Sequence, residues 1–499
     1  MNFSPIDGGI VGLYLVTTMV AGIWVRRYVG KVEHYLVAGR EMNLYLGIAS
    51  LAATEFGIVT CMYTAQNGYL YGFAGAWPGI AMALAMVVVG WTGFCIKPLR
   101  DARVMTIPEL LEKQFGSRVR WLAGVVIVLG GLLNMGVFLR MGGDFLIAVT
   151  HTQPEGASFL AAHLLEITMT VLLVCVALYT VLGGMLSVLV TDYLQFIVMS
   201  LGLLAVTVFI LMTIGWETIS ASVAARHGAG GFNPWVNPDL GPAFVIFMLI
   251  HNLAVVLTWQ TIIQRLLSAK DTSTGRKVYT RTSFFFVCRF VIPGLWGAAA
   301  LAWLAPDINV GDKGILAMPT LLGEIVPVGL LGILVAAMLA ADMSTDSAYM
   351  LTWGSVIYND ILAPLRRRRA WSERRGLLVN RTIVALIGAF LLFYGLWYEF
   401  EGDVWTYLAV TGTIYLASMS VLLVACCYWK RANSWGAMAA LIAGAVVPCL
   451  FLVLEKMEWS KPWAEGKGNF FGLTTYAVVI LAMVVGSWLK VALSNKEAR

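Results

Sequence analysis

The amino-acid sequence predicts an all-α polytopic membrane protein, a fold class indicated by its composition and by its long apolar runs. Of its 499 residues, 59% are hydrophobic and only 12% are charged, and the mean hydropathy is +0.80. Ordinary globular domains contain about 25% charged residues. A membrane-spanning helix needs about 20 mostly apolar residues, and most apolar residues of this chain fall in runs of that length. These observations nearly exclude a soluble enzyme.

Apolar runs bounded by charge, glycine or proline predict about 13 transmembrane helices. Their approximate centres are Leu15, Phe56, Val87, Leu132, Val171, Leu201, Leu253, Ile292, Leu339, Ala389, Tyr415, Gly444 and Ile480. We expect the first run to stay in the mature protein, because Met1 to Gly8 lack the basic start of a cleavable signal peptide. The seven cysteines lie in apolar runs without metal-ligand spacing, so neither disulfides nor a zinc site are expected.

The basic residues predict the orientation of the chain in the membrane. If the first span runs inward, alternate loops place 27 of the 34 Lys and Arg residues in the cytoplasm. The six segments are Arg26 to Arg40, Lys97 to Arg120, Arg265 to Arg281, Arg366 to Arg381, Lys430 to Arg431 and Lys490 to Arg499. An excess of Lys and Arg is typical of cytoplasmic loops. We therefore expect a multi-pass protein of the cell (plasma or inner) membrane, with its N-terminus outside and its C-terminus in the cytoplasm.

Two of the predicted spans contain enough polar residues to be broken helices. One is centred near Glu55, and the other, five spans later, contains His251, Asn252 and Gln260. This arrangement predicts a transporter built from inverted repeats, with substrate bound at the membrane midplane. Ordinary spans with polar packing residues are the alternative. The predicted parts are a leading helix and cytoplasmic loop (1–43), a first repeat (44–215), a second repeat (242–428) and two additional C-terminal helices (429–499).

The ninth predicted span carries a candidate ion site. Ala341, Ser344 and Thr345 share one helical face, and broken backbone near Ala53 to Phe56 would add carbonyl oxygens. Alternatively, these hydroxyls bond their own helix or a neighbouring one. Asp342 and Asp346 are candidates for coupling, because two buried carboxylates cannot readily both be charged without sodium or a proton.

Ionisable residues inside spans usually line a site or a cavity. The sequence has seven such residues, namely Glu55, Arg140, Asp144, Asp192, Arg289, Asp342 and Asp346. For Arg140, a local ion pair with Asp144 is the alternative to a site. His251 is predicted to be buried, where helix packing is favoured over a proton relay. Catalytic motifs such as GxSxG, HExxH and the Walker loop are missing, which leaves a membrane enzyme or a channel as distant alternatives.

Several motifs resemble the sodium:solute symporter family, in family order over nearly the whole chain. They are Gly39-Arg40, Ser50 to Ala53, Gly68-Tyr69, Thr106 to Glu109, Phe115-Gly116, Tyr179 to Gly184, Ser187-Val188, Thr191-Asp192, Gln195, Gln264 to Lys270, Ala341 to Ser347 and Asp360. The resemblance implies a LeuT-like core of five plus five helices, with one helix before it and two after.

The resemblance also implies that Na+ is the cofactor. The implied ligands are the carbonyls of Ala53, Phe56 and Ala341 and the hydroxyls of Ser344 and Thr345. Some relatives hold a second sodium ion at positions that match Asp192, Ser344 and Ser347, although one expected serine is Ala348 here.

The resemblance bears on the substrate through the two broken helices. Sugar-transporting members have a Gln and a gating Tyr where this chain has Thr60 and Thr261, which disfavours a sugar. Trp259-Gln260 is similar to the choline-transporting branch, whose aromatic box holds a quaternary ammonium, but Glu55 replaces a tryptophan of that box. The candidate substrate-binding residues are Glu55, Thr60, Tyr63, Arg140, Trp259 and Gln260.

Together these residues favour an amino-acid-like or amine-bearing solute. We therefore expect a sodium-coupled secondary symporter, not an enzyme, that imports a small polar organic solute by alternating access. A monocarboxylate or sugar symporter of the same family and a proton-coupled member are the alternatives. The expected partners are the small-molecule substrate, sodium and the lipid bilayer. Neither a nucleic acid nor an obligate protein partner is indicated.

Overall fold

The computed structural model is helical throughout the residues it describes, which are 3–150, 163–306, 308–311, 314–365, 371–397, 404–464 and 466–497. Within these ranges there is no β-strand, and the isolated bridge between Met42 and Ala269 joins two connecting segments. The prediction of an all-α protein is therefore confirmed.

The first half of the chain contains eleven described α-helices. They are α1 (Pro5–Val25), α2 (Val32–Val37), α3 (Leu44–Glu55), α4 (Ile58–Tyr71), α5 (Trp77–Thr92), α6 (Ile96–Asp101), α7 (Ile107–Phe115), α8 (Ser117–Met135), α9 (Phe138–Thr150), α11 (Leu164–Thr213) and α12 (Trp216–His227). Short 3₁₀ turns cover Arg26–Tyr28, Ala38–Arg40, Gly72–Ala76 and Gly228–Gly231.

The described helices of the second half begin with a second short pair. They are α13 (Gly241–Thr258), α14 (Gln260–Ser268), α15 (Thr272–Trp303), α16 (Ala317–Ile325), α17 (Leu330–Val356), α18 (Ala363–Leu365), α19 (Glu373–Trp397), α20 (Val404–Tyr428), α21 (Ser434–Lys456), α22 (Lys461–Ala464) and α23 (Gly468–Glu497). A π-helical turn, Ile357–Leu362, joins α17 to α18.

Eleven helical stretches of the described chain are long and apolar enough to cross a membrane. One of them, α11, has 50 residues and contains a non-helical residue, Gly184, with φ 55°. At this residue a Cβ would lie 2.6 Å from the backbone oxygen of Tyr35, so glycine permits both the bend and the close packing. The bend separates the predicted spans centred on Val171 and Leu201. The number of 13 spans itself stays a prediction.

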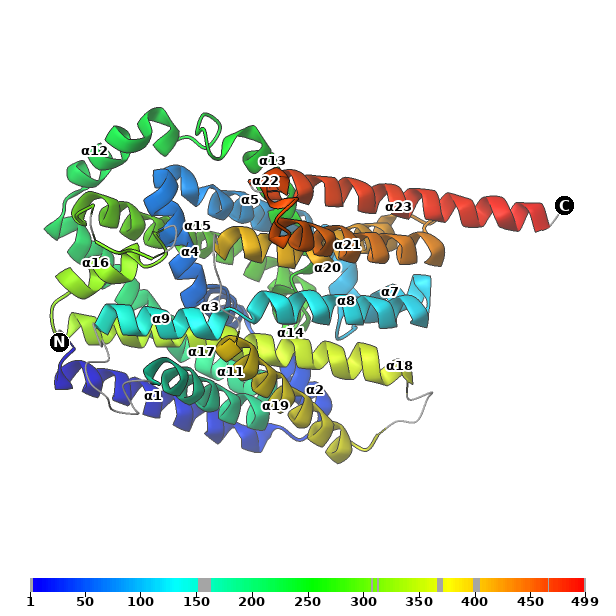
Figure 1. Ribbon diagram of the computed structural model, residues 1–499. Helices are drawn as coiled ribbons and strands as arrows, with labels where there is room; N and C mark the ends of the chain where they lie inside the picture. The colour runs from blue at the N-terminus through cyan, green and yellow to red at the C-terminus, as the bar shows by residue number, and fades with distance from the viewer. Residues whose placement is uncertain are drawn as a thin grey trace.

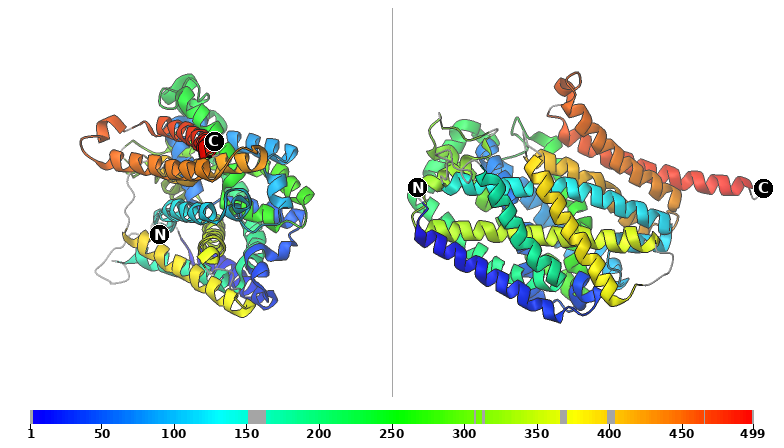
Figure 2. Two further views of the ribbon diagram at one scale, coloured as in Figure 1. Left: turned by 90° about the vertical axis from the view of Figure 1, so that its right-hand side faces the viewer. Right: turned by 60° about the horizontal axis from the view of Figure 1, so that its bottom comes forward.

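The long helices lie side by side, and the two chain ends lie at opposite ends of the bundle (Figure 1). The right-hand rotated view agrees with this arrangement and shows α23 extending past the bundle at its C-terminal end (Figure 2). Helix α17 runs through the bundle and packs against α11, α1 and α3. Nearly all of its residues are buried, so its polar side chains must find partners inside the protein.

Helices α4 and α15 approach each other closely enough for their backbones to touch. A Cβ added to Gly68 would lie 2.0 Å from the carbonyl oxygen of Gly294, and one added to Gly297 would lie 1.8 Å from that of Ala65. Small residues permit such close packing between membrane helices. Gly68 of α4 and Gly297 of α15 therefore permit the close packing that positions α4, which carries part of the site.

Candidate substrate and ion site

Two helices are broken near the middle of the bundle. α3 ends at Glu55, and Phe56 (φ −99°, ψ 68°) and Gly57 (φ −77°, ψ 163°) separate it from α4. α13 ends at Thr258, and Trp259 (ψ 115°) separates it from α14. Both breaks lie where the polar residues of the sequence predict them. A break frees backbone carbonyls and N–H groups from the helical ladder, so they can bind an ion or a ligand.

The first break lies against α17 through Thr345. The hydroxyl of Thr345 donates to the carbonyl oxygen of Thr54 over 2.9 Å. A Cβ added to Gly57 would lie 2.6 Å from the same hydroxyl oxygen, so a larger residue at the break would push the helices apart. The carbonyl of Ala53 accepts the N–H of Phe56 at 3.2 Å. The structure thus brings Thr345 to the break, as the candidate sodium site requires.

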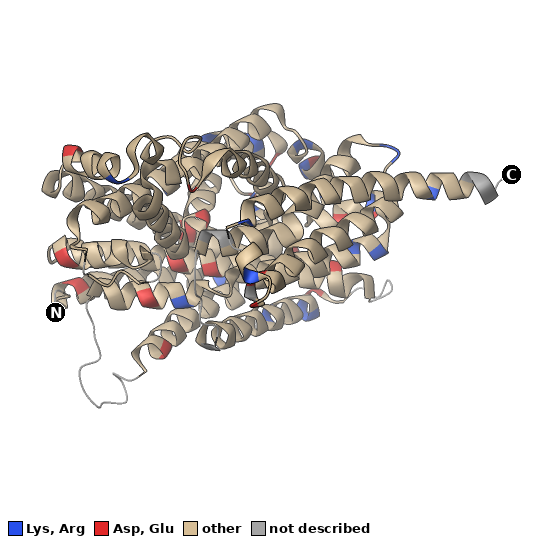
Figure 3. Cartoon of the chain, turned by 45° about the horizontal axis from the view of Figure 1, so that its top comes forward, with Lys and Arg blue, Asp and Glu red and all other residues tan. Residues whose placement is uncertain are grey.

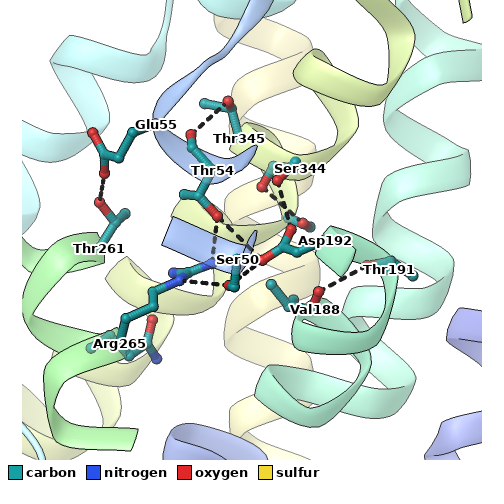
Figure 4. A network of polar contacts seen from close by, with 12 residues as sticks. Ser50, Thr54, Glu55, Val188, Thr191, Asp192, Thr261, Arg265, Ser344 and Thr345 are labelled. Carbon is teal, nitrogen blue, oxygen red and sulfur yellow. Dashed lines mark hydrogen bonds and ion pairs between the residues drawn. The ribbon is translucent and has the colours of Figure 1, made fainter. Parts of the chain in front are cut away.

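Ser344 points to a different partner, the carboxylate of Asp192 on α11 (Figure 4). Its hydroxyl donates to Oδ1 of Asp192 over 2.6 Å. The other oxygen, Oδ2, accepts the hydroxyls of Ser50 at 2.5 Å and Thr54 at 3.3 Å. It also accepts Nη2 of Arg265 at 3.1 Å. We call Asp192, Ser50, Thr54, Arg265 and Ser344 the Asp192 cluster.

Arg265 lies elsewhere than the sequence predicts. The positive-inside pattern assigns it to a cytoplasmic loop, but the structure places it on α14 with its side chain fully buried. Its Nε donates to Ser50 at 3.1 Å and its Nη2 to Thr54 at 2.6 Å. A buried guanidinium needs an anionic partner, and Asp192 supplies it. Counting loop charges from sequence cannot separate such an arginine from a solvated one.

The candidate positions for a second sodium ion are only partly brought together. Asp192 and Ser344 are in contact, whereas the hydroxyl of Ser347 donates to the carbonyl of Ser344 on its own helix, at 3.1 Å.

A cavity lies beside the first break, with a volume of about 80 Å³. Ligand pockets usually measure about 300–1,000 Å³, so this cavity would have to widen to hold a small solute. The residues of its lining that carry polar or aromatic groups include Glu55, Thr60, Tyr63, Asn134, His251, Asn252, Trp259, Arg289, Asp342, Thr345 and Tyr349. Four candidate substrate residues are among them. Arg140 and Gln260 are not part of this lining.

Glu55 and Arg289 form an ion pair at the cavity. Oε2 of Glu55 lies 3.2 Å from Nη1 of Arg289, and Oε1 accepts the hydroxyl of Thr261 at 2.5 Å. Nη2 of Arg289 donates to the hydroxyls of Thr60 and Tyr63, at 3.2 and 3.1 Å. From the sequence, Arg289 is predicted to be an ionisable residue within a span, but its pairing with Glu55 is not predicted. A buried arginine needs an acidic partner, and this requirement could have led from the sequence to an acidic partner for Arg289.

Asp342 contributes a second carboxylate to the cavity lining. Asp342 is 2% exposed, and its Oδ2 accepts no hydrogen bond from any described residue. Asp346, one turn further along α17, is also buried but does not line the cavity. The two carboxylates therefore occupy different surroundings although they share one helix.

Aromatic rings pack around Trp259. The ring centroid of Trp259 lies 5.7 Å from that of Tyr349, 5.7 Å from that of Tyr415 and 6.0 Å from that of Trp353. Because the rings contact one another, a cation cannot sit between them. Only Trp259 and Tyr349 of this group line the cavity, so they alone can offer a ring to a ligand there.

Broken helices that meet at a buried polar cavity are a feature of many secondary transporters. The model of the "Sodium:solute symporter family" matches residues 35–444. The chain belongs to the sodium:solute symporter family.

Named relatives agree with this assignment. The chain is 27% identical over 499 residues to Sodium/glucose cotransporter 4 of Danio rerio, an alignment that covers 90% of this chain and 72% of the relative. It is 26% identical over 505 residues to Sodium/myo-inositol cotransporter 2 of Sus scrofa, covering 91% of this chain and 71% of that protein.

Solved structures show the same fold. A Na+-coupled sialic acid symporter in its substrate-bound outward-open state matches with a TM-score of 0.79 at 19% identity, over 97% of this chain and 98% of that one. MhsT in complex with L-phenylalanine matches with a TM-score of 0.52 at 14% identity, over 89% and 99% of the two chains. The protein is thus a sodium-coupled symporter with a LeuT-like fold, a multi-pass membrane protein and not an enzyme.

Proposed function

We propose that this symporter imports a small polar solute that carries a protonated amine, and that the solute binds in the cavity beside Asp342. The carboxylate of Asp342 carries this proposal, because Oδ2 is buried and accepts no hydrogen bond within the described chain. Of the acidic residues that line the cavity, Glu55 is already paired with Arg289. An ammonium group at Asp342 would supply the missing charge and hydrogen-bond donors.

The rest of the lining suits such a solute. Trp259 and Tyr349 offer aromatic rings that attract a cation. Arg289 offers a guanidinium at which a carboxylate of an amino-acid-like solute could compete with Glu55. We therefore assign anion binding to Arg289 and not to Arg140, which is a candidate substrate-binding residue in the sequence but does not line the cavity. Thr60 and Tyr63 orient Arg289 and line the same cavity.

We assign the co-transported sodium ion to the first break, as the resemblance implies. The ligands would be the carbonyls of Ala53, Phe56 and Ala341 and the hydroxyls of Ser344 and Thr345. The contact of Thr345 with the backbone of Thr54 supports this site, because it already joins α17 to the break. An ion there would hold α3 and α17 together and so favour the substrate-ready form. By reciprocity, substrate must tighten sodium binding by the same factor.

The proposed transport direction is inward, with the N-terminus outside and the C-terminus in the cytoplasm. Figure 3 shows most of the blue Lys and Arg segments toward the end of the bundle that carries the C-terminus. This distribution supports the orientation, since cytoplasmic ends are enriched in Lys and Arg. The loops at Arg366 to Arg369 and Glu399 to Asp403 lie outside the described residues. The division into repeats 44–215 and 242–428 is also kept as a proposal.

A polyol or sugar is the second candidate substrate, because the named relatives are sodium/glucose and sodium/myo-inositol cotransporters. Hydroxyl groups could bond the Glu55–Arg289 pair and Tyr63. A neutral polyol would leave Asp342 without a counter-charge. If a proton that binds Asp342 or Asp346 moved across the membrane together with the solute, transport would be proton-coupled. The two substrate classes therefore differ in their dependence on Asp342.

Thermal unfolding of the purified protein can separate these candidates. Amino acids, amines, carboxylates and polyols are tested with and without sodium, since a ligand that binds only the native state raises its stability. We expect stabilisation by amine-bearing compounds in sodium, and its loss in Asp342→Asn. Ser355→Ala, also on α17, serves as the control because its hydroxyl bonds only its own helix at Thr352. Stabilisation by a polyol that persists in Asp342→Asn would overturn the amine proposal.

A further inference from the structure

The Asp192 cluster is a complete cation site whose cation belongs to the protein. Asp192 is fully buried, and a buried carboxylate is costly unless it is paired and hydrogen-bonded. Its two oxygens accept three hydroxyls, from Ser50, Thr54 and Ser344, and one guanidinium nitrogen, from Arg265. These residues lie on α3, α11, α14 and α17, so four helices meet at the carboxylate of Asp192 (Figure 4).

The same residues do not fit a second sodium ion. Ala348 stands where a serine is expected for such a site, and the hydroxyl of Ser347 donates to the carbonyl of Ser344 on its own helix. Nη2 of Arg265 lies 3.1 Å from Oδ2 of Asp192. The guanidinium therefore occupies the space beside this oxygen in which a sodium ion would have to bind. Placing sodium there would set two positive charges against one carboxylate in a buried site. Repulsion at such short range in a low dielectric is strongly unfavourable.

We propose that Arg265 is a tethered cation that takes the place of a second sodium ion at Asp192. The chain then binds one sodium ion, at the first break near Thr345. Because its cation cannot leave, the Asp192 cluster contributes no ion gradient to transport. It instead holds α14, the second half of the second broken helix, against α3 and α11.

Counting bound sodium on the purified protein tests this proposal without any substrate. Saturation binding of radioactive sodium is expected to give one ion per wild-type protein. Arg265→Ala frees the carboxylate of Asp192 and the hydroxyls of Ser50 and Thr54 from the guanidinium, so this variant is expected to bind two. The double variant Arg265→Ala/Asp192→Asn removes the carboxylate and is expected to return to one. Arg381→Ala is the matched control, because Arg381 donates to the backbone oxygen of Leu182 in a different region.

Two ions in the wild-type protein, or one ion in folded Arg265→Ala, would overturn the proposal. If Arg265→Ala does not fold, the wild-type count still decides whether a second sodium ion binds. Arg265→Lys then provides the second variant, since a shorter cation that retains its charge should keep the count at one. Because no substrate is present, this result is independent of whether the solute carries an amine.

Discussion

Arg289 on α15 lies 3.2 Å from Glu55, the last residue of α3 before the first break. The same guanidinium contacts Thr60 and Tyr63 on α4, beyond the break. One side chain thus bridges the two halves of a discontinuous helix. Its charge is balanced by the residue at the helix end, so the pair can stabilise the break and still face the cavity.

The first prediction concerns the Glu55–Arg289 pair. Arg289→Gln leaves Glu55 buried beside Thr261 without its cation, and loss of one partner of a buried pair costs about 3–5 kcal/mol. The double variant Glu55→Gln/Arg289→Gln leaves two neutral amides, so it should recover much of that loss. Thermal unfolding in detergent measures both. Equal stability of the single and double variants would show that the charges are not coupled.

The second prediction concerns the sodium ion. Thr345→Ala and Ser344→Ala each remove one oxygen that we assign to the ion. A hydrogen bond to a charged group is worth about 1.5–3 kcal/mol. Each variant should therefore raise the sodium concentration for half-maximal transport by roughly tenfold or more. Ser355→Ala is the control on the same helix. Sodium-dependent uptake into proteoliposomes at fixed pH provides the measurement. Sodium dependence unchanged in both variants would leave Ser344 with its bond to Asp192 and Thr345 with its bond to Thr54, and would remove both from the ion site.

The third prediction concerns orientation. Ser372, before α19, and Ala229, after α12, are exposed residues that we assign to the cytoplasmic and outer faces. Single cysteines at these positions, in a background without the seven native cysteines, should label from opposite sides of sealed vesicles. Cysteines in the Arg366 and Glu399 to Asp403 loops provide an independent pair. Labelling of either pair from one side would rule out the proposed topology.

The fourth prediction concerns the start of α15, at the proposed cytoplasmic end of the helix that carries Arg289. Asp271 is its N-cap, and the N–H of Thr274 donates to its carboxylate at 2.7 Å. This bond lowers the pKa of Asp271 below its ordinary value. Asp271→Ala should reduce stability at pH 7 by about 0.5–2 kcal/mol, and Asp271→Asn much less, because asparagine also caps helices.

The pH dependence of this cap follows from the direction of the pKa shift. A carboxylate with a lowered pKa in the folded state contributes stability above its ordinary pKa, and that contribution is lost as the pH falls through the folded pKa. The stability advantage of the wild type over Asp271→Asn should therefore shrink on acidification below about pH 3.9. Thermal unfolding of both proteins at pH 7 and below about pH 3.9 checks this. A stability advantage of the wild type over Asp271→Asn that grows in acid would contradict it.

The sequence predicted the fold class and the places of the two helix breaks because each depends on local composition. Polar residues near Glu55 and Trp259 weaken otherwise apolar runs, and both helices end there. The sequence predicted two separate spans, centred on Val171 and Leu201. It did not predict that one helix, α11, contains both and bends at Gly184. Hydrophobicity reports whether a segment crosses the membrane, but it does not report how two crossings are joined.

The partners of the charged residues were harder to predict because they come from distant parts of the chain. Spacing along one helix suggested Arg140 with Asp144 and Asp342 with Asp346. The structure adds two pairs that no such spacing indicates, Glu55 with Arg289 and Asp192 with Arg265. Such pairs depend on how four or more helices pack, and no periodicity within a single helix encodes that arrangement.

The glycine contacts between α4 and α15 have a mechanical consequence. With Gly68 against the backbone of Gly294, and Gly297 against that of Ala65, these two helices are in close backbone contact, so we expect them to move together. Thr60, Tyr63 and Arg289 all lie on these two helices, whereas Glu55 lies on the other side of the hinge at Phe56 and Gly57. A change of angle at Phe56 and Gly57 would therefore alter the Glu55–Arg289 separation, so this one distance can be used to follow such a motion.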